Sequence, residues 1–118
     1  MNGDLFMTFN ELHNQKPTLQ WKQRMEEGDD LFSEENIIET DKLLSSFLDE
    51  FENMSQQNEE TILQSVERVV LGLNELNEAY NDFIETLERE ELCEFILEAA
   101  KTAGLNSDED ITEEWREW

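Results

Sequence analysis

The side chains that could do chemistry in this sequence are almost all carboxylates. The chain of 118 residues has 31 Asp and Glu against 8 Lys and Arg, with one histidine and one cysteine. Acid–base catalysis by two carboxylates needs burial to separate their pKa values. Pairs such as Glu90 and Glu91 instead fall on a predicted helix surface, where both side chains are solvated. We therefore expect no catalytic residues and no enzymatic activity.

The sequence does not predict a metal site or a bound cofactor. His13 has no second histidine and no paired cysteine to complete a metal site, so a surface histidine is the simplest interpretation. Asp108, Asp110 and Thr112 resemble the start of a calcium-binding loop, but Glu113 occupies the position where that loop needs glycine. The chain also has no Glu-x-x-His motif for a carboxylate metal centre and no Gly-rich phosphate loop.

The carboxylates give the chain a formal net charge of −23. Residues 26–60 hold 13 acids and one base, and residues 61–104 hold 10 acids and three bases. Such a field repels nucleic acid and anionic lipid, and it speeds the encounter with basic proteins. We therefore expect a basic protein partner, with no nucleic-acid partner and no membrane partner. Solubility alone is the simpler explanation of the charge.

Apolar residues recur at the 3.6-residue spacing of amphipathic helices. Ser33 and Asn58 are suitable N-caps for two of these helices, and Gly104 suits the left-handed position after a third. Pro17 suits the first turn of a short helix near the N-terminus. The predicted helices span Glu34–Asn53, Glu59–Glu78, Thr86–Ala103 and Asp110–Trp118, with a short helix near Thr18–Glu26.

These elements predict an all-α fold, a compact bundle of about four main helices with short connectors. Residues 1–33 are expected to form an N-terminal arm with the short helix, packed on the acidic helical bundle of residues 34–118. One cysteine excludes an internal disulfide, and the N-terminus lacks the pattern of a signal peptide. No run of 18 apolar residues is present. We expect a cytoplasmic protein.

Three strings in the second half of the chain resemble a group of small acidic bacterial proteins. They are Leu71–Asn77 (LGLNELN), Ile84–Ile96 (IETLEREELCEFI) and the closing Asp110–Trp118 (DITEEWREW). The group is the immunity proteins of polymorphic and contact-dependent toxin systems, and the resemblance covers residues 62–118. It implies a protein that binds and occludes a cognate toxin, often a basic nuclease. The strings carry no known chemistry, so the resemblance assigns no binding residues.

Charge and resemblance together predict an immunity protein, or antitoxin, that neutralises a cationic toxin domain, such as a nuclease, by covering its active site. Two alternatives stay open. One is a DNA mimic, whose carboxylates imitate a phosphate backbone to block a nucleic-acid-binding protein. The other is an acidic adaptor or regulatory subunit. In each case we expect a monomer when the protein is free.

The predicted contact surface lies on the connector before Thr86–Ala103, on the outer face of that helix and on the C-terminal segment. Residues 82–98 hold seven acids against one base, Arg89. The acids of residues 26–60 are more numerous, but they fall mostly in a turn and at helix starts, where capping and the helix dipole account for them. The predicted contact residues are Asp82, Glu85, Glu88, Glu90, Glu91, Glu94, Leu97, Asp108, Asp110, Glu113 and Trp118.

Overall fold

The computed structural model describes residues 8–54, 57–107 and 109–118, and the regular structure in these ranges is entirely helical. The prediction of an all-α bundle is therefore confirmed. Asp108 lies outside the described residues, so its predicted contact role is not tested. The helices are α1 (Phe9–His13), α2 (Pro17–Glu26), α3 (Glu34–Glu52), α4 (Glu59–Ala79) and α5 (Thr86–Ala103).

The three long helices begin and end where the local signals predict. The Ser33 hydroxyl accepts a hydrogen bond from the Asn36 N–H at 3.1 Å, and the Asn58 side-chain oxygen accepts one from the Thr61 N–H at 3.0 Å. These contacts satisfy N–H groups that a first helical turn leaves without a partner. Gly104 follows α5 with a φ of 121°, which glycine adopts without strain. All three predicted caps are confirmed.

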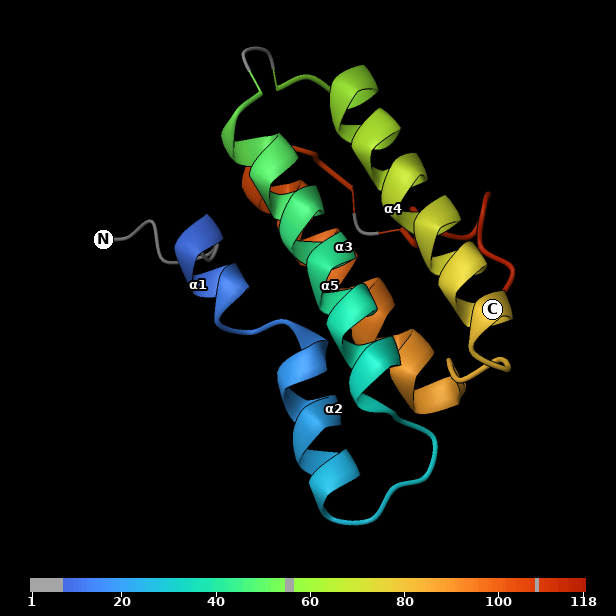
Figure 1. Ribbon diagram of the computed structural model, residues 1–118. Coiled ribbons are helices and arrows are strands. Elements are labelled where there is room, and N and C mark those ends of the chain that lie inside the picture. Colours follow the sequence, from blue (N-terminus) through green and yellow to red (C-terminus); the bar gives the residue numbers. More distant parts are fainter. Residues whose placement is uncertain (1–7, 55–56, 108) are drawn as a thin grey trace.

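The bundle has four corners. α3 packs against α4 and also against α1 and α2, and α5 contacts the same three helices. In Figure 1, α5 lies behind α3, and the α1–α2 pair lies on the opposite side of α3 from α4. The short helices α1 and α2 thus share one corner, while α3, α4 and α5 each occupy another. This arrangement leaves α5 with one outer side, which carries its polar residues.

The predicted helix over Asp110–Trp118 is wrong. The segment forms a single turn, in which two backbone N–H groups donate to the Thr112 carbonyl oxygen. The Asn74 side chain of α4 then binds the backbone that follows: its amide donates to the Trp115 carbonyl at 2.8 Å, and its oxygen accepts from the Glu117 N–H at 3.0 Å. Tertiary hydrogen bonds replace helical ones here, because so short a helix is marginal by itself.

The fourth corner of the bundle is formed by the N-terminal part of the chain and not by the C-terminal segment. Trp21 of α2 connects this corner to the core. The Trp21 indole has no exposed surface. It stacks on the Phe32 ring with centroids 5.3 Å apart and meets the Phe83 ring edge-on at 6.0 Å. Pro17 occupies the first turn of α2, as predicted, where its missing N–H has no helical role. The described part of residues 1–33 therefore contributes to the core.

Candidate partner-binding surface

α5 presents a row of carboxylates on the side that faces away from the core. The inner side of this helix is apolar, and it buries Leu92 and Ile96 completely. Glu91, Glu94 and Glu98 recur at intervals of three and four residues, so they follow one side of the helix. Two grooves flank this row, and Glu94 lines both of them. Glu94 therefore lies between two concave surfaces, and Glu91 and Glu98 line the first of them.

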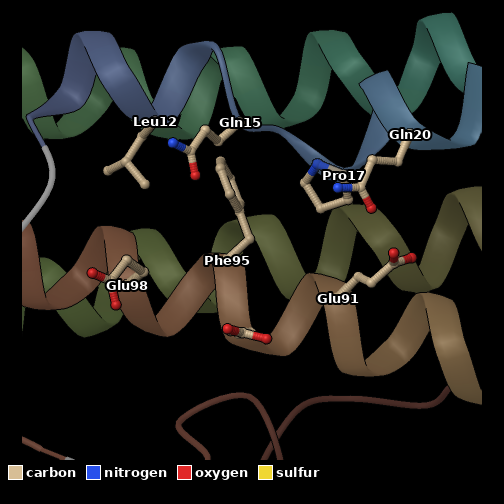
Figure 2. Close-up of a pocket in the computed structure, with 8 residues that line it drawn as sticks. Leu12, Gln15, Pro17, Gln20, Glu91, Phe95 and Glu98 are labelled. Atoms are coloured by element: carbon tan, nitrogen blue, oxygen red, sulfur yellow. The ribbon is translucent and has the colours of Figure 1, made fainter.

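The first groove lies between α5 and the chain from α1 to α2, and we name it the acidic groove. It has a volume of about 510 Å³. Figure 2 shows Phe95 rising from α5 between Glu91 and Glu98, toward Gln15 and Pro17 on the opposite wall. No basic residue of the described chain lines it. The lining residues are Leu12, Gln15, Pro17, Gln20, Glu91, Glu94, Phe95 and Glu98.

The second groove lies between α5 and the C-terminal segment, and we name it the C-terminal groove. It has a volume of about 540 Å³. It brings together four of the predicted contact residues, and its two arginines make it less negative than the acidic groove. Leu97 is half-buried at this groove rather than fully outward. The lining residues are Arg89, Glu90, Cys93, Glu94, Leu97, Glu109, Asp110 and Arg116.

Glu88 and Glu91 hold α5 to α2. Glu91 Oε1 accepts hydrogen bonds from Trp21 Nε1 at 2.9 Å and from Arg24 Nη2 at 2.6 Å. Glu88 is only 4% exposed, and its Oε1 accepts from the Glu85 N–H at 3.1 Å. Its Oε2 lies 3.9 Å from Arg24 Nη2. The prediction that Glu88 is a surface contact is therefore wrong, because this carboxylate is buried, closes the first turn of α5 and faces the half-buried Arg24.

Asp110 holds the C-terminal segment in place. Its Oδ1 accepts from the Thr112 N–H at 3.0 Å, and its Oδ2 lies 3.2 Å from Arg116 Nη1. Arg116 Nη1 also donates to Cys93 Sγ on α5 at 3.0 Å, and the guanidinium carbon lies 5.6 Å from the centre of the Trp118 ring. These contacts fix one wall of the C-terminal groove, so Asp110 is only partly available to a partner.

Three carboxylates of α5 have no partner within the described chain. Glu90, Glu94 and Glu98 form neither an ion pair nor a side-chain hydrogen bond with any described residue. Leu87, which sequence analysis did not single out, lies one turn before Glu90 and Glu91 and is 51% exposed. The outer side of α5 thus combines unpaired negative charge with an exposed apolar side chain.

The acids of α3 act instead on side chains of the fold itself. The pKa of the Tyr80 hydroxyl is raised above its ordinary value. Loss of hydration is the larger cause, and a hydrogen bond with Glu35 is the next. A hydrogen bond with Glu50 raises the pKa of the Arg68 guanidinium. Both carboxylates belong to α3. Glu50 joins α3 to Arg68 within α4, and Glu35 joins it to Tyr80, which follows the last residue of α4.

One cluster among the described residues groups three side chains that can bind metals. The ligand atoms of His13, Asp49 and Glu52 all lie within 4.8 Å of one another. His13 Nε2 lies 3.1 Å from Glu52 Oε1 and 3.5 Å from Asp49 Oδ1. The two carboxylates are exposed on α3, and a direct polar contact between α1 and α3 accounts for the cluster.

The other predicted contacts lie outside the two grooves. Asp82 and Glu85 are exposed before and at the start of α5, but neither lines a groove. Asp82 has a φ of 56°, and its N–H donates to the Asn77 carbonyl oxygen at 2.7 Å, which closes the connector. Glu113 is exposed on the C-terminal turn, whereas Trp118 is half-buried against the core.

Sequence reasoning missed half of the acidic groove. Gln15 and Gln20 lie far from α5 in the sequence, and only the tertiary fold brings them opposite it. Glu98 carried a usable signal, because it follows Glu94 by four residues and Glu91 by seven, which is the spacing of one helix face. Phe95 belongs to the core and is also among the residues that line the groove.

Comparisons with known proteins return no relative from which a site could be transferred. A scan of protein-family models, a search of curated proteins and a search of solved structures each found no match. In the ranges that the structure describes, none of the helices combines the length and the apolar composition needed to cross a membrane. Function is therefore inferred from the chemistry of the α5 surface.

Proposed function

We propose that this chain is an immunity protein, a non-enzymatic inhibitor that binds a cationic toxin domain through the outer side of α5 and covers the toxin's active site. The observation that carries the proposal is that Glu90, Glu94 and Glu98 have no partner among the described residues. A carboxylate without an internal cation keeps its full attraction for a basic partner, whereas a paired one is already locally neutralised. The inhibitor acts in the bacterial cytoplasm and is a monomer before it binds.

Charge and apolar contacts have separate tasks in this proposal. The net charge of −23 steers a basic partner toward the surface and sets the rate of encounter. Affinity comes from a few central anchors that lose their water on binding. Leu87, which is 51% exposed, and half-buried Leu97 in the C-terminal groove are the apolar candidates for such anchors.

A DNA mimic is the principal alternative. A mimic needs regular negative charge along an elongated face, and it has no need of apolar anchors. On α5, however, the carboxylates are interspersed with exposed Leu87 and half-buried Leu97. This mixture favours recognition of one protein surface over imitation of a phosphate backbone.

Co-expression tests the proposal. The toxin domain that the proposal requires is sought among the neighbouring reading frames and expressed together with the chain, and growth is followed after the toxin is induced. Growth should continue with the wild-type chain and stop with a Glu90→Lys, Glu94→Lys variant that folds normally by circular dichroism. Growth arrest in the presence of the folded wild-type chain would dismiss the proposal.

A further inference from the structure

We infer that His13, Asp49 and Glu52 form a binding site for a divalent metal ion of the zinc type, which joins the C-terminal end of α1 to the last turn of α3. The site lies on a different part of the molecule from the α5 surface, and it does not depend on the immunity function. Sequence spacing hides it, because the two carboxylates follow the histidine by 36 and 39 residues.

The three side chains offer the mixed set of ligand atoms that zinc accepts. Imidazole nitrogen and carboxylate oxygen are both zinc ligands, whereas Ca²⁺ and Mg²⁺ take oxygen ligands. His13 is the only histidine of the chain. Among the described residues, only this group brings three metal-binding side chains together. The nitrogen distinguishes the group from the acidic patches elsewhere on the surface, which supply oxygen alone.

The distances between the ligand atoms fit one small ion. Bonds of about 2.0–2.2 Å in a tetrahedral site place neighbouring ligand atoms about 3.3–3.6 Å apart. His13 Nε2 lies 3.1 Å from Glu52 Oε1 and 3.5 Å from Asp49 Oδ1, and all three ligand atoms lie within 4.8 Å of one another. Small rotations of these side chains let a zinc ion reach all three, and water completes its coordination.

The position of the carboxylates on α3 also favours a cation. Asp49 and Glu52 both lie in the last turn of this helix, which contains no basic residue. The helix dipole is negative at this end, so it disfavours carboxylates and favours cations. The His13 ring makes its hydrogen bond with Glu52, and Asp49 has only the longer contact with the same nitrogen. A divalent ion contacts both carboxylates at once, which one imidazole N–H cannot do.

The site is formed before an ion arrives. The direct contact between His13 and Glu52 already holds the side chains together. Leu12, the neighbour of His13, has no exposed surface, and the rings of Phe9 and Phe51 pack α1 on α3 with centroids 6.1 Å apart. Because the backbone on both sides is fixed, binding loses little conformational entropy.

A bound ion would hold a helix that is marginal by itself. α1 has only five residues, too few for a stable isolated helix. Leu12 and Gln15, on either side of His13 in the sequence, line the acidic groove. An ion held by α1 and α3 together therefore fixes this wall of the groove, and it stabilises the fold in proportion to its occupancy.

Nuclear magnetic resonance on the full-length ¹⁵N-labelled chain tests the inference with Zn²⁺ as the probe. The titration is run without Mg²⁺ and again in excess Mg²⁺, which occupies diffuse acidic surface but prefers oxygen ligands. Because the chain has one histidine, its ring signals report on His13 directly. We expect a saturable shift of the His13 Nε2 signal with one ion bound, in both buffers.

Two variants of equal charge test the ligands. Asp49→Asn with Glu52→Gln should weaken zinc binding by about tenfold or more, because even groups that only support metal ligands contribute that much. The control Glu26→Gln with Glu27→Gln removes the same charge from the exposed C-terminal end of α2 and should stay within about twofold. Circular dichroism checks that both variants fold.

Three results would overturn the inference: a His13 ring that does not respond to Zn²⁺, a response that excess Mg²⁺ abolishes, or equal losses in the two variants. The wild-type chain gives the first and second results even if a variant fails to fold. None of these measurements uses the toxin. Failure here would therefore reject the metal site and leave the proposed function to its own test.

Discussion

The acids of α3 and the acids of α5 have the same chemistry but different surroundings. On α3, Asp41 lies 3.0 Å from Lys16 Nζ and accepts from Thr18 Oγ1 at 2.7 Å. Glu50, on the same helix, accepts from Ser65 Oγ at 2.8 Å. These carboxylates join α3 to its neighbours. On the outer side of α5, Glu90, Glu94 and Glu98 have no such partners in the described chain.

This difference teaches that the number of acids in a segment does not identify a contact surface. Residues 26–60 contain more acids than residues 61–104, 13 against 10. Many of the former contact cations or hydroxyl groups of the fold, and so they have less attraction left for another protein. What α5 adds is that its unpaired carboxylates Glu90 and Glu94 line grooves and lie close to exposed Leu87.

The largest expected effect separates two neighbours on α5. Glu91→Ala removes the acceptor of Trp21 and Arg24, and it should lower the free energy of unfolding by about 2 kcal/mol, because the buried Trp21 N–H and the half-buried Arg24 guanidinium lose their partner. Glu94→Ala, three residues later, should change it by less than about 0.5 kcal/mol. Urea unfolding of the two variants measures both values. Equal losses would show that the division into internal and free acids is incorrect.

Binding kinetics give the next effect. If unpaired acids steer the toxin, its association rate should fall about tenfold between low and physiological ionic strength, since salt screens exposed charges. The dissociation rate should change much less, because the anchors are short-range contacts. Stopped-flow measurements over a salt series give both rates. An association rate independent of salt would mean that the charge serves solubility only.

A smaller effect is expected on α3. Glu50→Ala leaves the hydroxyl of Ser65, which is 1% exposed, without its acceptor and removes the ion pair with Arg68. It should lower the free energy of unfolding by about 1 kcal/mol. Toxin affinity should stay the same, because Glu50 does not line either groove of α5. Thermal unfolding and calorimetry on one sample compare the two quantities, and a loss of affinity alone would contradict the assignment of α3.

Local signals explain which parts of the fold were predictable. The long helices carry apolar periodicity and caps such as Ser33 and Asn58, so their ends were predicted to within about two residues. The segment after Asp110 also shows helical spacing, but the Asn74 side chain of α4 takes its backbone groups. That competition depends on tertiary contacts, which spacing does not reveal.

The site was predictable only on one side. The acids of α5 are visible as a dense run, and the core-facing position of Glu88 could have been inferred from Leu92, four residues later. The pairing of Glu91 with Arg24 could not have been inferred, and neither could the position of Gln15 opposite α5. Both join distant parts of the sequence. Consequently the helix face was predicted and its grooves were not.

The most direct test of the central claim is a charge reversal on α5 and a matched one within residues 26–60, measured as toxin affinity by titration calorimetry. Glu90→Lys with Glu94→Lys should weaken binding by more than about 1 kcal/mol. Glu26→Lys with Glu27→Lys makes the same change in net charge at the exposed C-terminal end of α2, where cations suit the helix dipole, and should have an effect below about 0.5 kcal/mol. A loss of affinity in the second variant but not in the first would contradict the account and place the contact surface within residues 26–60.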